Sequence, residues 1–291
     1  MRIRPWLLAI ALAASACGAR SSVATPIPTP GTARPIPRSS AASPTPVVLI
    51  VMENHSAAEI LGASRAPYLH RFAAAGTRFT NMVALTHPSL PNYLAMTAGG
   101  TLGCTDDACP PNAYRTPNLF SQLQLAGLRW RAWEESMPGS CVRYDAGAYA
   151  VRHDPAVYFR SLRATVCAQR VLPYPARLPA QLPAFTFVTP NLCDDMHGAP
   201  GCAATDPIAR GDAWLSRHVP PLLARGAVVI VTFDEGAGAD QRIYCAMRGP
   251  GVPAHGQDGH RYTHLGLLAG LERFFGLGRI RGARTARPLP I

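Results

Sequence analysis

Polar side chains follow three apolar runs of this sequence, at the point where each run ends. The first run leads into Glu53 and Asn54, the second leads towards Asp195 and His197, and the third leads into Asp234 and Glu235. A single acid after a strand is usually a helix cap or part of a solvated turn. Several carboxylates in one crevice would repel each other without a cation. Oxygen ligands with one or two imidazoles suit a divalent metal ion such as magnesium, calcium, manganese or zinc, and the pattern therefore predicts such a site.

A candidate nucleophile lies between the first two runs. Ser89 stands at the start of an apolar helical stretch, within the segment Thr86–Tyr93. Free backbone N–H groups and the helix dipole favour an anion there, either a serine alkoxide or a bound phosphate. Taken alone, Ser89 is better explained as a helix cap. Beside a metal ion, the pKa of its hydroxyl would fall and the serine would become a usable nucleophile.

The elements that must position these residues alternate along the chain. Continuous apolar runs predict buried strands at 47–52, 185–188 and 227–233, with weaker candidates at 128–133 and 243–247. Helical stretches are expected at 67–75, 89–98, 116–126 (capped by Thr116), 206–224 and 262–275. This alternation predicts an α/β fold with a parallel sheet covered on both faces. The carboxyl ends of such strands meet at one edge, where open α/β sheets build their sites.

Length and composition exclude two broad classes of protein. The chain has 291 residues, of which 48% are hydrophobic, so it can bury a sizeable core and is not wholly disordered. No apolar run reaches the roughly 18–20 residues that a spanning helix needs, which excludes a polytopic membrane protein.

The net charge of +11 does not predict a nucleic-acid partner. All 28 basic residues are arginines, and nine of them lie before residue 47 or within the last thirteen residues. The remaining arginines nearly balance the 17 acidic residues, whereas a nucleic-acid binder more often spreads basic residues over a face of its folded body. We expect a monomer that binds no nucleic acid.

The N-terminus has the pattern of an export signal. Arg2 and Arg4 precede a short apolar stretch, and small residues lead to Cys17. This favours a lipoprotein signal over residues 1–17 with Cys17 lipidated, although ordinary cleavage after Ala16 is the alternative. Residues 18–45 are rich in Pro, Ser, Thr and Ala and predict an extended linker. The folded domain is expected at 46–291, with a membrane contact only through the lipid anchor.

Export also decides how the other cysteines are interpreted. Outside the cytosol, closely spaced cysteines are more often disulfides than metal ligands. Cys104 with Cys109 and Cys193 with Cys202 are the local pairs, and Cys141 with Cys167 is a plausible third. Cys245 is then left over, and the sequence does not fix the connectivity.

Six short segments, in this order, resemble the bacterial phosphoesterase family of acid phosphatases and phospholipases C, which belongs to the alkaline phosphatase superfamily. The segments are Glu53-Asn54-His55-Ser56, Ala66-Pro67-Tyr68-Leu69, His87-Pro88-Ser89-Leu90-Pro91-Asn92-Tyr93, Asp194-Asp195-Met196-His197, Thr232-Phe233-Asp234-Glu235-Gly236 and Tyr262-Thr263-His264. Each segment is short, but six in register between Val47 and Leu277 are specific.

The resemblance implies a three-layer α/β/α sandwich with a mostly parallel central sheet and a metal-assisted covalent mechanism. It implies that a divalent metal ion is held by Glu53, Asn54, Ser89, Asp234 and Glu235, and that Ser89 attacks phosphorus to form a phosphoserine. Asp195, His197 and His264 fall where relatives place either a second metal or the groups that bind phosphate and protonate the leaving group. His87 either orients Ser89 or packs, and His55, His255 and His260 have no assigned role.

Departures from the family pattern lie at the rim of the expected site. Ala57 and Ala58 follow Ser56 where an aromatic residue is common, and Leu265 follows His264 where a serine is common. They bear on substrate preference more than on catalysis. The shortness of the chain favours a small phosphomonoesterase of the acid phosphatase type, acting on a small phosphate ester. A phospholipase C-like phosphodiesterase and a non-enzymatic solute-binding lipoprotein are the alternatives.

Overall fold

The three continuous apolar runs form the middle of a central sheet in the computed structural model, which describes Pro44–Ile291. They are β1 (Val47–Met52), β6 (Phe185–Thr189) and β7 (Val228–Phe233), and every residue in them is buried. Burial on both faces is what a run without alternating polar residues requires. The weaker candidates are strands with different bounds, namely β4 (Trp130–Glu134) and the pair β8 (Arg242–Ile243) and β9 (Cys245–Arg248).

Five further strands are short. They are β2 (Thr77–Phe79), β3 (Met82–Val83), β5 (Val171–Pro173), β10 (Gly256–Asp258) and β11 (Tyr262–Thr263). The large sheet has the order β10-β2-β9-β7-β1-β6-β4-β5, and β11-β3-β8 form a smaller sheet. From β5 to β7 all pairs are parallel, and β9 runs antiparallel to both β7 and β2. The expected mostly parallel sheet is confirmed.

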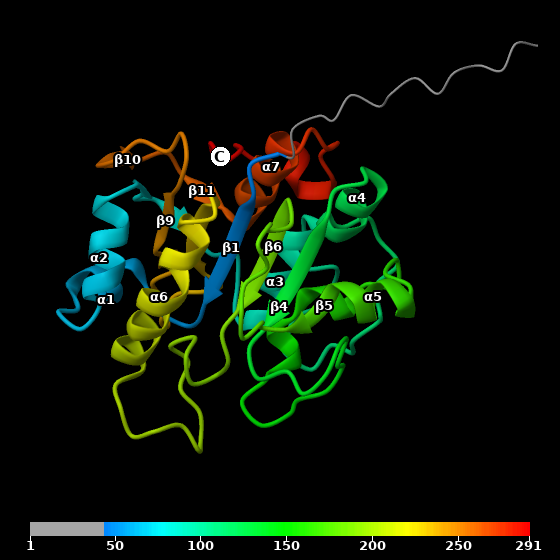
Figure 1. Ribbon diagram of the computed structural model, residues 1–291, viewed down its shortest axis with the longest axis horizontal. Helices are drawn as coiled ribbons and strands as arrows, with labels where there is room; N and C mark the ends of the chain where they lie inside the picture. Colours follow the sequence, from blue (N-terminus) through cyan, green and yellow to red (C-terminus); the bar gives the residue numbers. More distant parts are fainter. Residues whose placement is uncertain (1–43) are drawn as a thin grey trace, which may run out of the picture. The chain divides into compact units, whose positions relative to one another are not determined.

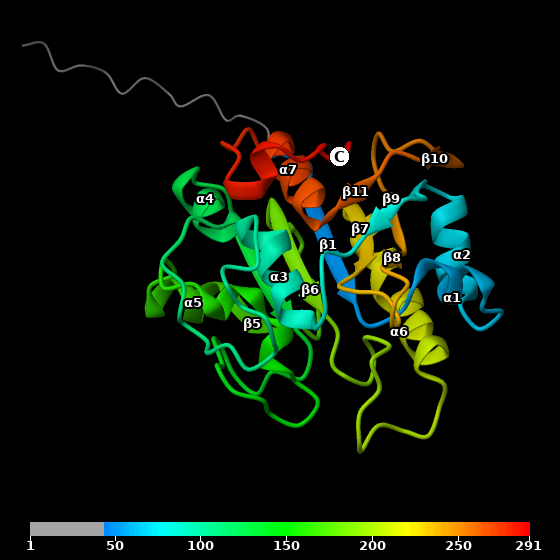
Figure 2. The same cartoon turned by 180° about the vertical axis from the view of Figure 1, so that it is seen from behind.

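Helices cover both faces of this sheet. They are α1 (Ala57–Gly62), α2 (Pro67–Ala74), α3 (Ser89–Ala98), α4 (Leu119–Leu125), α5 (Ala164–Arg170), α6 (Pro207–Leu223) and α7 (His264–Phe274), with 3-10 turns η1 (Val151–His153), η2 (Pro155–Tyr158) and η3 (Arg281–Arg284). Helices α2 and α6 contact each other and lie in front of the sheet in Figure 1. Helices α3 and α7 contact each other and lie on the opposite face of the sheet, which faces the viewer in Figure 2. The three-layer α/β/α arrangement is therefore confirmed.

Two helices begin later than the sequence predicts. Thr116 does not cap α4, because Asn118 does: its side chain accepts a hydrogen bond from the Ser121 N–H at 2.9 Å and forms a capping box with that serine. The hydroxyl of Thr116 instead accepts hydrogen bonds from Arg281. In the last long helix the first two expected residues pair with β3 as strand β11, and the helix begins at His264.

All three suggested cysteine pairs are disulfides. Cys104 is bonded to Cys109, Cys141 to Cys167 and Cys193 to Cys202. Cys245 is a free and buried cysteine on β9. Among residues 44–291, no helix combines the length and the hydropathy that crossing a membrane requires. The predicted export signal and nearly all of the predicted linker lie outside the described residues.

Candidate functional site

The register of the central strands brings the first and third polar segments together. Met52 at the end of β1 pairs with Phe233 at the end of β7, so Glu53 and Asp234 follow side by side. The Asn54 N–H donates to the Asp234 carboxylate at 3.2 Å. Asn54 has a left-handed backbone with φ of 59°, a conformation that asparagine tolerates better than most residues. The two strand ends thus form one side of the site.

Ser89 faces this pair from helix α3, of which it is the first residue. Its hydroxyl donates to Glu53 Oε2 at 3.0 Å, and the Tyr93 hydroxyl donates to Glu53 Oε1 at 2.5 Å. Ser89 and Tyr93 are four residues apart and so lie on the same face of the helix. Both oxygens of the fully buried Glu53 carboxylate are therefore held by a single helix.

The segment after β6 supplies the opposite side. The Glu53 N–H donates to the Asp195 backbone oxygen at 2.8 Å, and Asp195 is fully buried. The His197 N–H donates to the Asp195 carboxylate at 2.7 Å, and His197 Nδ1 contacts the Gly198 backbone oxygen at 2.6 Å. The neighbouring Asp194 instead forms an ion pair with Arg210 at 2.8 Å.

His153 completes the centre, and the sequence reasoning missed it. Its Nε2 lies 3.3 Å from Glu53 Oε2 and its Nδ1 lies 3.5 Å from Asp195 Oδ2. The ring stacks on Tyr93, with 5.4 Å between ring centroids. Ligand atoms of Glu53, His153 and Asp195 all lie within 4.8 Å of one another, the spacing of a group that could hold a metal ion.

Glu235 and His264 lie at the margins of this centre. Glu235 Oε2 is 2.9 Å from His87 Nδ1 and 3.4 Å from Asn92 Nδ2, so it is joined to the segment around Ser89. His264 is buried, and its Nε2 donates to the Asp234 backbone oxygen at 2.5 Å.

Two of the histidines without an assigned role have other contacts. His55 Nε2 contacts the Met196 backbone oxygen at 3.2 Å, and the exposed His260 pairs with Asp258 at 2.7 Å.

The buried polar atoms of the site fit a bound cation. Within Pro44–Ile291, five of them are buried without a hydrogen-bond partner: Asn54 Oδ1, His153 Nε2, Asp195 Oδ2, Asp234 Oδ2 and His264 Nδ1. Leaving a buried polar group unpaired is costly, so such atoms are rare unless a ligand satisfies them. Oxygen and imidazole nitrogen atoms in this proportion are suitable ligands for a divalent metal ion.

Burial also shifts the pKa values of the acids and histidines in this site. Burial, together with the charges of Asp234 and Asp195, raises the pKa of Glu53 well above its ordinary value. Burial also raises the pKa of Asp195 and, together with the charge of Asp234, raises that of Glu235 to about 7. For the histidines, burial lowers the pKa of His153 well below its usual range and that of His264 to about 4. Burial disfavours the charged form of each group, so the carboxyls keep their protons and the imidazoles lose theirs.

The free energy of unfolding of the metal-free protein is expected to fall as the pH rises from about 6.5 through about 7, because the pKa of Glu235 is raised to about 7 and those of Glu53 and Asp195 are raised above their ordinary values. Carboxyl groups with a raised pKa keep protons in the folded state that they have lost in the unfolded state, so raising the pH favours unfolding. Histidines with a lowered pKa act in the opposite sense only below their ordinary value of 6.5, and they do not offset this loss.

Thermal unfolding in a chelator, measured from about pH 6.5 to about pH 8, checks this, and a drop in Tm on the order of 5 °C is expected. Adding back a divalent cation should reduce that drop, because positive charge lowers the pKa of the clustered carboxyls. A chelated protein whose Tm is constant or rises over this range would contradict the expectation.

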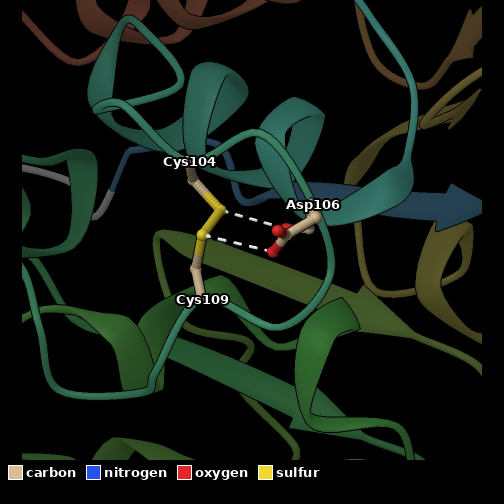
Figure 3. A group of neighbouring side chains, drawn as sticks. All are labelled: Cys104, Asp106 and Cys109. Carbon is tan, nitrogen blue, oxygen red and sulfur yellow. Dashed lines mark hydrogen bonds between the residues drawn. A yellow bond between two sulfur atoms is a disulfide. The ribbon is translucent and has the colours of Figure 1, made fainter.

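A second group with metal-like residue types is a disulfide instead. Cys104, Asp106 and Cys109 lie close together, but the two sulfurs are bonded to each other and Asp106 lies beside them (Figure 3). Bonded sulfurs are not thiolates, and the thiolate is the form that binds metal.

Comparison with known proteins decides the family. The model of the phosphoesterase family matches residues 63–278, which contain most of the site described above. The chain belongs to the phosphoesterase family. The family expected from the six sequence segments is thereby confirmed.

This phosphoesterase is similar to several curated phosphatases. It is 37% identical over 251 residues to the phosphatidylinositol-3-phosphatase of Mycobacterium tuberculosis, a match that covers 84% of this chain and 81% of the relative. It is 29% identical to the phosphate-repressible acid phosphatase of Penicillium chrysogenum, covering 72% of this chain and 54% of that protein. These relatives confirm the expected enzyme class, a hydrolase acting on phosphoric ester bonds.

Solved structures give the same fold. A Vibrio parahaemolyticus protein of the alkaline phosphatase superfamily aligns with a TM-score of 0.57 at 10% identity, covering 85% of this phosphoesterase and 71% of that chain. The phosphonate monoester hydrolase of Agrobacterium radiobacter aligns with a TM-score of 0.53 at 14% identity, covering 84% and 78% of the two chains. Likeness at this identity supports the expected alkaline phosphatase-like fold and nothing finer.

Proposed function

We propose that this chain is an exported, metal-dependent phosphomonoesterase in which Ser89 is the nucleophile. The observation that carries the proposal is the position of Ser89, buried at the first turn of α3 with its hydroxyl 3.0 Å from Glu53 Oε2. Its surroundings combine a helix N-terminus with buried polar atoms that lack partners, an arrangement suited to a cation and an anionic substrate.

The residues divide into two sets around the serine. Glu53, Asn54 and Asp234 would hold a divalent metal ion beside Ser89, with Glu235 next to them. Glu53, His153 and Asp195 form the compact group that would hold a second ion or fix the first. When bound, a divalent cation would lower the pKa of the serine hydroxyl, and its positive charge would stabilise the phosphoryl oxygens.

The reaction is a double displacement at phosphorus. The Ser89 oxygen bonds to phosphorus while the bond to the leaving-group oxygen breaks, and that oxygen takes up a proton. His197 is the proposed proton donor, because Nδ1 contacts the Gly198 backbone oxygen and Nε2 remains available. Water then attacks the phosphoserine, its bond to the Ser89 oxygen breaks, and inorganic phosphate is released.

The substrate class is a phosphate monoester. Relatives that cover most of the chain are named phosphatases, and the mycobacterial relative is named for the 3-phosphate of phosphatidylinositol. A phosphorylated inositol lipid therefore belongs in the substrate panel, beside small soluble monoesters. Export is proposed from the signal-like residues 1–17 and agrees with the three disulfides, which form in oxidising compartments.

Hydrolysis of p-nitrophenyl phosphate and of bis(p-nitrophenyl) phosphate by the full chain tests the proposal. We expect the monoester to be cleaved, chelation to lower the rate by at least about a hundredfold, and a divalent cation to restore it. Faster cleavage of the diester would favour the phospholipase C-like alternative. Binding of phosphate compounds with no turnover under any divalent cation would favour a solute-binding protein.

A further inference from the structure

A short disulfide-closed loop brings a carboxylate to the helix end that carries Ser89. The loop Cys104–Cys109 follows helix α3 in sequence and returns to its first turn. Asp107, within this loop, accepts a hydrogen bond from the Leu90 N–H at 2.9 Å through Oδ1. Leu90 is the residue directly after Ser89. Its N–H is one of the free donors that a helix N-terminus offers to an anion.

The other oxygen of the same carboxylate faces an arginine. Arg152 Nε lies 3.6 Å from Asp107 Oδ2, and the Arg152 side chain is 20% exposed. Arg152 directly precedes His153, which lies in the buried group with Glu53 and Asp195. A guanidinium beside backbone N–H groups is a usual arrangement for binding phosphoryl oxygens. In the described structure this pair of donors holds an aspartate.

The loop is built to keep Asp107 in place. Its ends are joined by the disulfide (Figure 3), and the Asp106 carboxylate accepts the Ala108 N–H at 2.9 Å inside the loop. The Cys104 N–H donates to the Thr101 backbone oxygen at 3.0 Å. A short closed loop keeps its side chains near their partners, so Asp107 has a high effective concentration at the helix end.

We propose that Asp107 is an internal competitor of the substrate, and that Arg152 is a phosphate-binding residue released when Asp107 is displaced. This inference rests on the proposed function of the same site. A phosphate monoester carries more negative charge than a diester and so displaces a carboxylate more readily. The Asp107 loop would therefore favour monoesters over diesters.

Asp107→Asn is the direct test, made in the full chain with its disulfides intact. Asparagine keeps the shape and one acceptor oxygen for Leu90 but removes the charge that competes with phosphate. If the closed arrangement holds about nine-tenths of the molecules, KM for p-nitrophenyl phosphate and Ki for inorganic phosphate should each fall about tenfold. The value of kcat should change by less than about twofold, since Asp107 is displaced when the substrate binds and contacts no reacting atom.

Asp106→Asn is the matched control, because it removes the same charge from the adjacent residue. Asp106 accepts a hydrogen bond within its own loop and forms no hydrogen bond or ion pair with Leu90 or Arg152, so KM should stay unchanged. An unchanged or higher KM in Asp107→Asn would overturn the proposal. Equal effects of both substitutions would also overturn it, since they would reflect general charge rather than competition.

Arg152→Gln tests the second half of the inference. Loss of the guanidinium should raise KM about tenfold. The decrease in KM caused by Asp107→Asn should become smaller in the Arg152→Gln background, because part of that decrease comes from the release of Arg152. Strictly additive effects of the two substitutions would mean that Arg152 does not change partners.

Binding of inorganic phosphate, measured by calorimetry in the Ser89→Ala background, separates this inference from the proposed function. Tighter binding in Asp107→Asn than in its parent supports the competition even if no ester is hydrolysed. Equal binding in the two proteins, or none in either, would overturn the competition even if the enzyme is an active phosphatase.

Discussion

Substituting Ser89 by alanine is expected to lower phosphomonoester hydrolysis by at least about a thousandfold, with little change in stability. The hydroxyl is the group at the α3 N-terminus that touches Glu53, and alanine removes it without altering the helix backbone. Without this hydroxyl no phosphoserine can form at residue 89. Initial rates on p-nitrophenyl phosphate and thermal unfolding of both proteins measure the two effects.

Ser56→Ala is the matched control for this experiment. Ser56 is also buried and also precedes a helix, where its hydroxyl caps α1 by accepting the Glu59 N–H at 3.3 Å. Its loss should cost about 1 kcal/mol of stability and leave kcat nearly unchanged. A phosphoserine recovered by acid quench and mass spectrometry should appear in the wild type and be absent from Ser89→Ala. Activity that survives in Ser89→Ala would mean that water attacks phosphorus directly.

Glu53→Gln is expected to lower the activity and to raise the stability of the metal-free protein. Glu53 contacts Ser89, Tyr93 and His153 and is fully buried beside two other acids. Glutamine has nearly the same shape but no charge, so it should weaken binding of a divalent cation and lower the hydrolysis rate by at least about a hundredfold. The metal-free protein should become more stable, because glutamine has no carboxyl that must stay protonated in the buried acidic cluster.

The measurements are calorimetric cation binding, hydrolysis rate and Tm in a chelator, where a rise on the order of 3 °C is expected. Glu272→Gln is the control, since Glu272 is equally buried but lies on α7 and donates no group to the site. Burial raises the pKa of Glu272 to about 7, so its substitution changes a comparable carboxyl. A Glu53→Gln protein that keeps full activity would contradict the assignment of Glu53 to the metal site.

The predictable part of this fold is its buried centre. Strands β1, β6 and β7 are continuous apolar runs, and helix α3 begins and ends where its apolar pattern does. The polar residues at the ends of those strands were therefore visible in the sequence, and the structure places Glu53, Asp195 and Asp234 together. A run buried on both faces needs no tertiary information to be recognised.

The remainder depends on contacts between distant segments. His153 ends a three-residue 3-10 turn with no periodic pattern, and it is positioned because the Thr189 hydroxyl donates to its backbone oxygen at 3.1 Å. The sequence could have offered only one signal, a histidine between an arginine and an acid in a mostly apolar stretch. Strands of two or three residues such as β3 and β11 likewise show no periodicity, since pairing alone defines them.

The strand order also has a kinetic consequence. The innermost strand, β1, pairs with β6 and β7, which follow it by more than a hundred residues, and the site lies where these pairs end. Parallel pairing across such separations is slow, because a long loop must close, with a loss of chain entropy, before any stabilising contact forms. Glu53, Asp195 and Asp234 meet only when both crossovers are complete. Regained catalysis therefore requires both long-range pairings, and it is expected to lag behind the formation of helices and local turns.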